Sequence, residues 1–366
     1  MTKTKINEIT GLRGIAALMV MYTHFVSWFS LPLRTNFSGE IGVTIFFSLS
    51  GFLMAYLYIE KNFSASDVIE YAISRFSRIA PAYLFIIFIA YIISTKLDPH
   101  FIYDITNRNI IRHILFSGNI AVFWSITPEV EFYFLFIFIW AAASRLVVRF
   151  DIVALLALIL GSIVLLSYRD IFPGTFVGSK LHFFLFGVIA GAMRSKIKEG
   201  QGRKAMTLLH LALVSLVVLM EMGLISLPFA DNKEFYNSIL TAIFGAFLVF
   251  SFTFPSAIGK LFLENRLVIF CGECSFSIYL LHMPVLYLYK KILPGQPADL
   301  VSIGANIIFF TSLVIIVLLV SWLNFQYIEK PGARLIKSLG NRLKKRVLGL
   351  FPVAKSTQPF SVKGGN

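Results

Sequence analysis

The run GLRGIAALMVMYTHFVSW, from Gly11 to Trp28, is apolar enough to cross a membrane as one helix. Such a helix needs roughly 20 mostly apolar residues. The run nevertheless contains Arg13 near its start and His24 well inside it. Ionisable groups within a membrane span are costly and usually mark function. This stretch therefore predicts both a membrane fold and a candidate site.

The rest of the chain has the same apolar character. Hydrophobic residues make up 57% of the 366 residues and charged residues 14%, whereas soluble domains are about a quarter charged. We expect an all-α, polytopic bundle with about ten transmembrane helices, and we expect the mixed stretch 103–124 at the outer interface. The expected spans are Gly11–Phe29, Gly42–Ile59, Ala80–Thr95, Pro128–Ser144, Ile152–Ser167, Ser179–Met193, Ala205–Leu227, Tyr236–Phe254, Val268–Leu288 and Val301–Phe325.

The positions of the basic residues predict the orientation. A net charge of +14 would suit nucleic-acid binding, but Lys and Arg concentrate in alternate loops. Ten spans put both termini on one side, and if that side is the cytoplasm, most of the 33 Lys and Arg lie inside. This positive-inside bias accounts for the charge without nucleic acid. We therefore predict a membrane domain over residues 1–335 and a basic cytoplasmic tail over residues 336–366, whose run RLKKR contacts lipid headgroups.

Two cysteines, Cys271 and Cys274, form a single CxxC motif. A zinc site would need further Cys or His ligands at matching spacing. The motif also lies where a hydrophobic span begins. These features favour a structural role over a redox one, and no metal site is expected.

Arg13 and His24 are eleven residues apart, so on a helix they lie within roughly 20° of the same face and about 16 Å apart along the axis. Arg13 would lie at the cytoplasmic end and His24 toward the outer half. A long donor with an anionic head, such as coenzyme A, would fit this spacing, because guanidinium binds phosphate and histidine is the usual general base. The alternative is that Arg13 only follows the positive-inside rule and His24 packs against a neighbour.

Three further polar positions fit a donor site at the same end. Ser50 belongs to a stripe of small residues in the second span, which equally suits close helix packing. Arg75 and Arg78 are three residues apart and share a helical face, as a phosphate-binding pair would. A positive-inside cluster is the alternative for this pair. Pro81 is expected in the first turn of the helix that follows.

The stretch WSITPEVEFY begins at Trp124. Thr127 suits a helix N-cap, and Glu129 and Glu131 suit the positive end of the helix dipole, so a purely structural account exists. Because this start is expected at the outer face, Trp124 and Tyr133 with Glu129 also suit a sugar-binding mouth. Glu129 would then bind the acceptor or orient His24, and Glu131 is the weaker candidate.

Two polar groups remain near the end of the chain. His282 lies within the ninth expected span, where it would contact a ligand or pack against a partner. Glu329 stands beside Lys330 at the end of the tenth span, and we expect an interfacial ion pair there.

Six sequence elements occur in order between Ile6 and Leu335: Arg13 and His24 with ten residues between them, FFSLSGFL, Arg75 with Arg78, WSITPE, SFSIYLLHMP and YIEKP. Together they resemble the membrane-bound acyltransferase family 3 of O-acetyltransferases. The resemblance implies that Arg13 and His24 are central and that the arginine pair holds coenzyme A. It implies transfer of an acyl group, commonly acetyl from acetyl-CoA, to a hydroxyl of a saccharide in a surface polysaccharide, peptidoglycan or lipid-linked glycan.

The predicted site combines these residues and contains no metal. The residues expected to be catalytic are His24, Arg13 and Glu129. Those expected to bind the donor are Arg13, Arg75, Arg78 and Ser50. Those expected to bind the acceptor are Trp124, Tyr133 and His282. His24 would either deprotonate the acceptor hydroxyl or carry the acyl group, and the sequence leaves both routes open.

Two features depart from the family pattern. Many members carry an extra span and an extracytoplasmic hydrolase-like domain after the tenth span, whereas 41 residues follow it here. We therefore expect a chain that acts alone or with a partner, either a polysaccharide-assembly protein or a second copy. The second departure is Pro128 in WSITPE, where an apolar or small residue is usual.

The resemblance implies an enzyme of the bacterial inner membrane, in contact with membrane lipids. The alternative function is a transporter or flippase that moves a glycan without modifying it, because buried Arg and His also suit a translocation path. Acetyl transfer from acetyl-CoA by the purified protein would distinguish the two.

Overall fold

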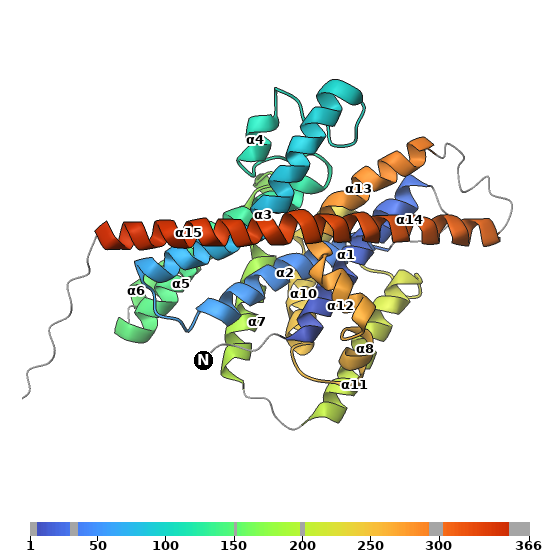
Figure 1. Cartoon of the computed structure of the whole chain (residues 1–366). Helices are drawn as coiled ribbons and strands as arrows, with labels where there is room; N and C mark the ends of the chain where they lie inside the picture. The colour runs from blue at the N-terminus through green and yellow to red at the C-terminus, as the bar shows by residue number, and fades with distance from the viewer. Residues whose placement is uncertain (1–5, 30–35, 150–151, 198–201, 293–302, 351–366) are drawn as a thin grey trace, which may run out of the picture.

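The computed structural model describes residues 6–29, 36–149, 152–197, 202–292 and 303–350, and every regular element in these ranges is a helix. The all-α expectation is therefore confirmed for this part of the chain. In Figure 1, α14 and α15 cross the face of the bundle as one long rod. The α-helices are α1 (Asn7–Trp28), α2 (Ser38–Tyr58), α3 (Ala65–Ile92), α4 (Ile110–Ile114), α5 (Ile126–Arg149), α6 (Ile152–Ser167), α7 (Val177–Lys196), α8 (Arg203–Glu221), α9 (Asn232–Asn237), α10 (Ile239–Ser251), α11 (Ala257–Phe262), α12 (Arg266–Glu273), α13 (Ser275–Ile292), α14 (Ile303–Asn324) and α15 (Lys330–Leu350).

Short segments of tighter or wider helix join several of these elements. Two are π-helical and two are 3₁₀-helical. They are the π-helices η1 (Ile93–Leu97) and η5 (Phe325–Glu329) and the 3₁₀-helices η2 (Ala121–Ser125) and η3 (Arg169–Ile171).

Six helical stretches in the described ranges are long and apolar enough to cross a membrane. They are Asn7–Trp28, Ser38–Tyr58, Ala65–Leu97, Ala121–Arg145, Arg203–Glu221 and Ile308–Val347. The expected number of ten is not confirmed: α6 and α10 have only 16 and 13 residues, and α7 is not among these stretches. The mixed stretch 103–124 contains only the short α4 and η2. The cytoplasmic placement of the termini stays a prediction.

The ninth expected span, Val268–Leu288, is broken. Helices α12 and α13 meet at an angle of 79°, and counted together they would make a seventh span. The break falls at the CxxC motif, where Cys271 and Cys274 are free and buried. Between them, a Cβ on Gly272 would lie 1.9 Å from the carbonyl oxygen of Thr10. The motif therefore lies where α12 packs directly on the backbone of α1.

Small residues bring α2 and α7 into close contact. A Cβ on Gly51 would lie 2.1 Å from the carbonyl oxygen of Phe184, and one on Gly187 would lie 2.3 Å from that of Ser48. Backbone-to-backbone packing of this kind requires glycine. Part of the small-residue stripe of the second span is thus a helix-packing surface.

Helix α3 begins at Ala65, well before the expected start of the third span at Ala80. Ser64 caps it, because its hydroxyl accepts the backbone N–H of Asp67. The early start places Arg75 and Arg78 on a regular helix. It also places Pro81 inside α3, so the expectation of a first-turn proline was wrong.

Helix α15 lies antiparallel to the first half of α3. A Cβ on Gly332 would lie 2.5 Å from Pro81, and Gly340 packs against Ile73 in the same way. Further along, Lys344 forms a 3.0 Å ion pair with Glu70. The predicted boundary between residues 335 and 336 thus falls inside a helix that packs on the bundle. Of the predicted tail, residues 351–366 lie outside the described residues.

Candidate active site

A cavity of about 400 Å³ opens between α1, α2, α3, α5, α13 and α15. It contains seven charged side chains, five basic and two acidic. Six of the nine predicted site residues line it, although they come from four helices. They are Arg13, Ser50, Arg75, Arg78, Glu129 and Tyr133.

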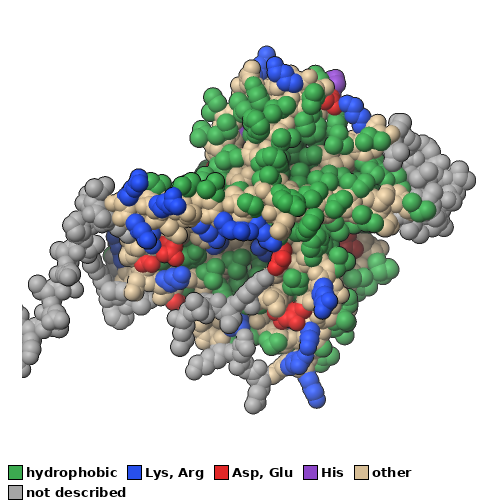
Figure 2. Space-filling view, in the orientation of Figure 1, with side chains coloured by type: hydrophobic (Ala, Val, Ile, Leu, Met, Phe, Trp, Pro, Cys, Tyr) green, Lys and Arg blue, Asp and Glu red, His purple; other side chains and the backbone are tan. Residues whose placement is uncertain are grey.

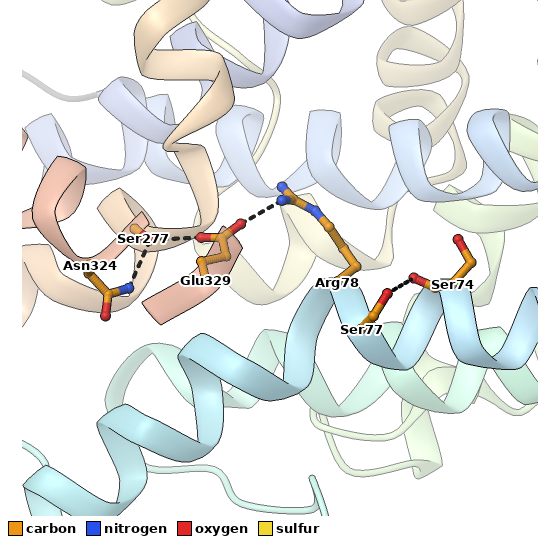
Figure 3. Close-up of polar contacts among 6 residues, drawn as sticks. All are labelled: Ser74, Ser77, Arg78, Ser277, Asn324 and Glu329. Carbon is orange, nitrogen blue, oxygen red and sulfur yellow. Dashed lines mark hydrogen bonds and ion pairs between the residues drawn. The ribbon is translucent and has the colours of Figure 1, made fainter. Parts of the chain in front are cut away.

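Glu329 organises one wall of this cavity (Figure 3). Its Oε1 accepts a 2.6 Å charged hydrogen bond from Arg78 Nη1, and its Oε2 accepts a 2.7 Å bond from the Ser277 hydroxyl. Asn324 supports the same hydroxyl through a 2.9 Å bond. Only 4% of the Glu329 side chain is exposed, so both oxygens of a buried carboxylate are satisfied, as burial requires.

The partner of Glu329 differs from the one expected. The sequence suggested Lys330, but Lys330 donates to Gln326 at 3.2 Å, and the ion pair forms with Arg78 from a distant helix. The wider helical turn η5 ends at Glu329. Such π-turns often mark functional positions. Here the turn accompanies the burial of Glu329 beside α3 and α13.

Glu129 lines another part of the cavity, where α2 and α5 meet. Its Oε1 accepts hydrogen bonds from the Ser50 hydroxyl at 2.8 Å and the Tyr133 hydroxyl at 2.6 Å. No bond to its Oε2 occurs among the described residues. Arg13 is close enough to interact electrostatically with Glu129, Arg78 and Glu329. Arg13 therefore interacts with both carboxylates of the cavity.

The start of α5 differs from the prediction in detail. The helix begins at Ile126 directly after η2, so Thr127 is not its N-cap. The Thr127 hydroxyl instead donates to the carbonyl of Gly118 at 3.1 Å. Glu131 accepts the backbone N–H of Val177 at 2.7 Å and so caps the first turn of α7. Two carboxylates two residues apart thus have different surroundings.

Two lysines that were not among the predicted site residues also line the cavity. They are Lys330 and Lys337 of α15, seven residues apart and therefore on one side of the helix. In Figure 2, Lys and Arg side chains form a row over α15, bordered by hydrophobic surface. Their seven-residue spacing was a usable signal, but a basic stretch after a final span is more readily interpreted as a solvated tail.

His24 lies beyond the cavity, toward the other end of α1. It contacts His282 of α13, with ring centroids 5.1 Å apart. His24 is half-buried and His282 is fully buried. Between this pair and the cavity stands Tyr279, which lines the cavity and has its ring centroid 6.0 Å from that of His282. The Tyr279 hydroxyl is 2.7 Å from that of Ser125.

Trp124 belongs to an aromatic cluster formed with α2 and α9. Its ring packs on Phe47 and on Tyr236, with centroids 6.3 Å and 5.6 Å apart. The buried Lys180 ammonium lies 4.6 Å from the centroid of the Tyr236 ring. Trp124 and Tyr133, grouped by the sequence as acceptor contacts, therefore have different neighbours.

The comparisons with known proteins agree on the type of enzyme. A family described as an acyltransferase domain matches residues 6–324. O-acetyltransferase OatA of Staphylococcus aureus is 23% identical over 358 residues, covering 88% of this chain and 56% of the relative. Peptidoglycan O-acetyltransferase OatA of Listeria monocytogenes is 24% identical over 369 residues, covering 88% and 55%. A putative acetyltransferase of Acidianus two-tailed virus, ORF330, is 25% identical over 292 residues, covering 75% and 82%.

The chain spans little more than half the length of the OatA relatives it matches. No solved structure matches it. The family match covers most of the chain and confirms the resemblance drawn from the six sequence elements. The chain belongs to this acyltransferase family.

Proposed function

We propose that this protein is a membrane O-acyltransferase that takes an acyl group, most commonly acetyl, from acyl-CoA and transfers it to a hydroxyl of a saccharide. The observation that carries the proposal is the cavity lined by Arg13, Arg75 and Arg78, because Arg13 lies on the same helix, α1, as His24. The family and the OatA relatives support the transferase class. The identities of the donor and of the acceptor are what the proposal adds.

The charges of the cavity suit a coenzyme A head group. Three arginines and two lysines face two carboxylates, which leaves an excess of positive charge. Coenzyme A carries a pyrophosphate and a ribose phosphate, and guanidinium groups bind phosphate through paired, charge-assisted hydrogen bonds. Lys330 and Lys337 would act as point charges around the same phosphates. Arg78 would remain anchored by Glu329 while its other nitrogens meet the ligand.

The spacing along α1 suits the extended arm of this donor. Arg13 and His24 are about 16 Å apart along the helix axis, so a head group at Arg13 would direct the thioester toward His24. Tyr279 lies on the way, since it lines the cavity and also contacts His282. The proposal therefore requires the Tyr279 side chain to move aside or the acyl end to pass beside it.

His24 would act by one of two routes. In direct transfer its free ring nitrogen takes the proton of the acceptor hydroxyl as that oxygen attacks the thioester carbonyl, and the coenzyme A thiolate leaves. In the carrier route the nitrogen attacks the thioester, the thiolate leaves, and the hydroxyl then attacks the acyl-imidazole. Glu129, held by Ser50 and Tyr133, would balance the charge of Arg13 beside the donor.

The acceptor would approach from the end of the bundle that carries Trp124. Aromatic faces beside charged groups suit a saccharide, and Trp124, Tyr236 and Lys180 gather there. The name of the Listeria relative, a peptidoglycan O-acetyltransferase, favours a cell-envelope glycan as acceptor. The apolar helices favour a location in the bacterial inner membrane. Polysaccharide-assembly proteins, or a second copy of this chain, are the expected partners.

The test uses a strain that lacks the gene, complemented with wild type, His24→Ala or His100→Ala. His100 is an exposed loop histidine outside the site and serves as the matched control. Mass spectrometry of surface glycans should show acetyl groups restored by wild type and His100→Ala, and absent with His24→Ala present at equal level in the membrane. Normal acetylation by His24→Ala would refute the proposal. Labelled acetyl-CoA given to the purified protein tests the donor separately.

A further inference from the structure

His24 and His282 form a hydrogen-bonded pair between α1 and α13. His24 Nδ1 lies 3.3 Å from His282 Nε2, and the two rings are tilted by 45°. His282 is 0% exposed. Two imidazoles at this distance inside a bundle share one proton between the facing nitrogens, so the position of that proton is set by what the other nitrogens contact.

The backbone around His282 fixes its proton. His282 Nδ1 lies 3.1 Å from the carbonyl oxygen of Ile278, and a carbonyl only accepts hydrogen bonds. The proton of a neutral His282 is therefore on Nδ1, which leaves a lone pair on Nε2. That lone pair faces His24 Nδ1.

The same reasoning fixes the proton of His24. Its Nδ1 lies 2.9 Å from the carbonyl oxygen of Val20 and also faces the His282 lone pair. Both neighbours accept, so His24 carries its proton on Nδ1 and shares it between them. Its Nε2 is then unprotonated, and no described residue donates to it. The reactive lone pair of His24 points away from His282.

We propose that His282 is a positioning residue that holds His24 in the tautomer with a free Nε2. In other histidine sites a carboxylate accepts this hydrogen bond. Here His282 takes that place as a neutral acceptor. When Nε2 of His24 takes a proton, Nδ1–H remains bonded to His282 and the imidazolium is stabilised. Protonation of His282 instead would place two N–H groups face to face, so the proton goes to His24. This inference rests on the proposed function.

The surrounding fold keeps the His282 ring in place. Pro284 has no N–H and leaves the carbonyl of Leu280 without its helical partner. The buried Tyr103 hydroxyl donates to that carbonyl at 2.7 Å. Tyr279 lies one turn before His282. Its hydroxyl contacts that of Ser125 and donates to the carbonyl of Val122 at 3.1 Å. The turn of α13 that presents His282 is thus fixed from outside the helix.

These contacts argue against the role suggested for His282 by the sequence. Both ring nitrogens are occupied, one by Ile278 and one by His24. The side chain does not line the cavity around Arg13. No polar atom of His282 is left to contact an acceptor, whereas orienting His24 uses both nitrogens.

The first experiment measures the tautomer directly. The protein contains six histidines, so ¹⁵N-histidine labelling in lipid nanodiscs gives few signals, and protonated and unprotonated ring nitrogens have well separated shifts. Loss of signals in His24→Gln assigns His24. We expect protonated Nδ1 and unprotonated Nε2 for His24 in wild type. In His282→Leu the Val20 carbonyl is the one acceptor left at Nδ1 among these two, and we expect a measurable fraction of the other tautomer to appear. A wild-type His24 protonated on Nε2, or a tautomer unchanged in His282→Leu, would overturn the proposal.

The second experiment tests rescue. Gln at position 282 can present an amide oxygen near the place of Nε2, whereas Leu cannot. His282→Leu should lower kcat by about 10- to 100-fold, as loss of a partner that orients a histidine ring does, with the KM for acetyl-CoA unchanged. His282→Gln should recover most of the rate and the single tautomer. Equal rates for the Leu and Gln variants at equal thermal stability would contradict the assignment. Because the tautomer is measured without turnover, an active His24→Ala would refute the proposed function and leave this result standing.

Discussion

The two ends of α1 hold their polar groups in opposite ways. Around Arg13 the neighbours are full charges, and Glu329 of that network is bonded at both oxygens by Arg78 and Ser277. Around His24 the contacts in the described structure are a neutral imidazole and a backbone carbonyl. One end is an ionic network and the other is a neutral hydrogen-bonded pair.

This difference has a physical basis. A charge taken out of water needs an opposite charge and further hydrogen bonds, because its desolvation costs several kcal/mol. A neutral imidazole needs only hydrogen bonds. On the proposed function, the polyanionic head of the donor stays at the ionic end and only a neutral thioester reaches the histidine end. The contacts at each end of α1 can therefore be removed by substitution without changing those at the other end.

The largest effect is expected when the ionic end loses Glu329. Glu329→Ala removes the partner of Arg78 and leaves a guanidinium that is only 30% exposed without its carboxylate. Breaking such a pair costs about 3 kcal/mol, so thermal unfolding in detergent should shift to clearly lower temperature. Lys330→Ala is the matched control, because Lys330 forms one hydrogen bond to Gln326.

The same variant sharpens the comparison between the ends. The tautomer of His24, measured with ¹⁵N-histidine, should be unchanged in Glu329→Ala, because none of its contacts involves the ionic network. The double variant Arg78→Met/Glu329→Leu should regain much of the lost stability, since apolar replacement of a buried ion pair is often neutral. A double variant as unstable as Glu329→Ala would show that the charges themselves are not the cause.

A smaller effect is expected from the two acidic residues of α5. Glu129→Gln keeps an oxygen for Ser50 and Tyr133 but removes the charge beside Arg13. The rate of acetyl transfer should fall about tenfold, which corresponds to about 1.4 kcal/mol. Glu131→Gln should leave the rate unchanged, because an amide oxygen still accepts the Val177 N–H. An equal loss of rate in the two variants would mean that Glu129, like Glu131, has only a structural role.

Much of the Arg13 end of α1 could be predicted from the sequence, because it depends on local helical periodicity. Arg13 and His24 are eleven positions apart, and Arg75 and Arg78 are three positions apart, so their helical faces follow from helix geometry alone. The small residues around Gly51 likewise predict close packing, and the structure supplies the partner, α7. The family followed from motifs of this kind and is confirmed.

What could not be predicted depends on contacts between distant segments. The ion pair between Arg78 and Glu329 spans 251 positions, and the nearer Lys330 was the natural expectation. The break between α12 and α13 at Cys274 lies inside a stretch that, taken as a whole, is apolar enough for one span, so average hydropathy does not reveal it. The pairing of His24 with His282 depends on how α13 packs beside α1 after that break.

The smallest effect is expected outside the membrane, at the end of α13 that follows His282. Asp98 accepts hydrogen bonds from Lys291 at 2.6 Å and from the Tyr287 hydroxyl at 2.7 Å. These bonds lower the pKa of Asp98 to about 2, and the bond from Lys291 has the largest effect. Asp98→Asn should lower the unfolding temperature only slightly, because exposed ion pairs contribute little, and the His24 tautomer should not change.

The pH dependence gives this last prediction its sign. A carboxyl with a lowered pKa stabilises the folded state above its ordinary pKa of about 3.9 and loses that contribution as the pH falls through the folded value. The difference in unfolding temperature between wild type and Asp98→Asn should therefore be constant from neutral pH to about pH 4 and shrink toward pH 2. A difference that disappears between pH 7 and pH 5 would mean that a histidine, not Asp98, controls this end of the bundle.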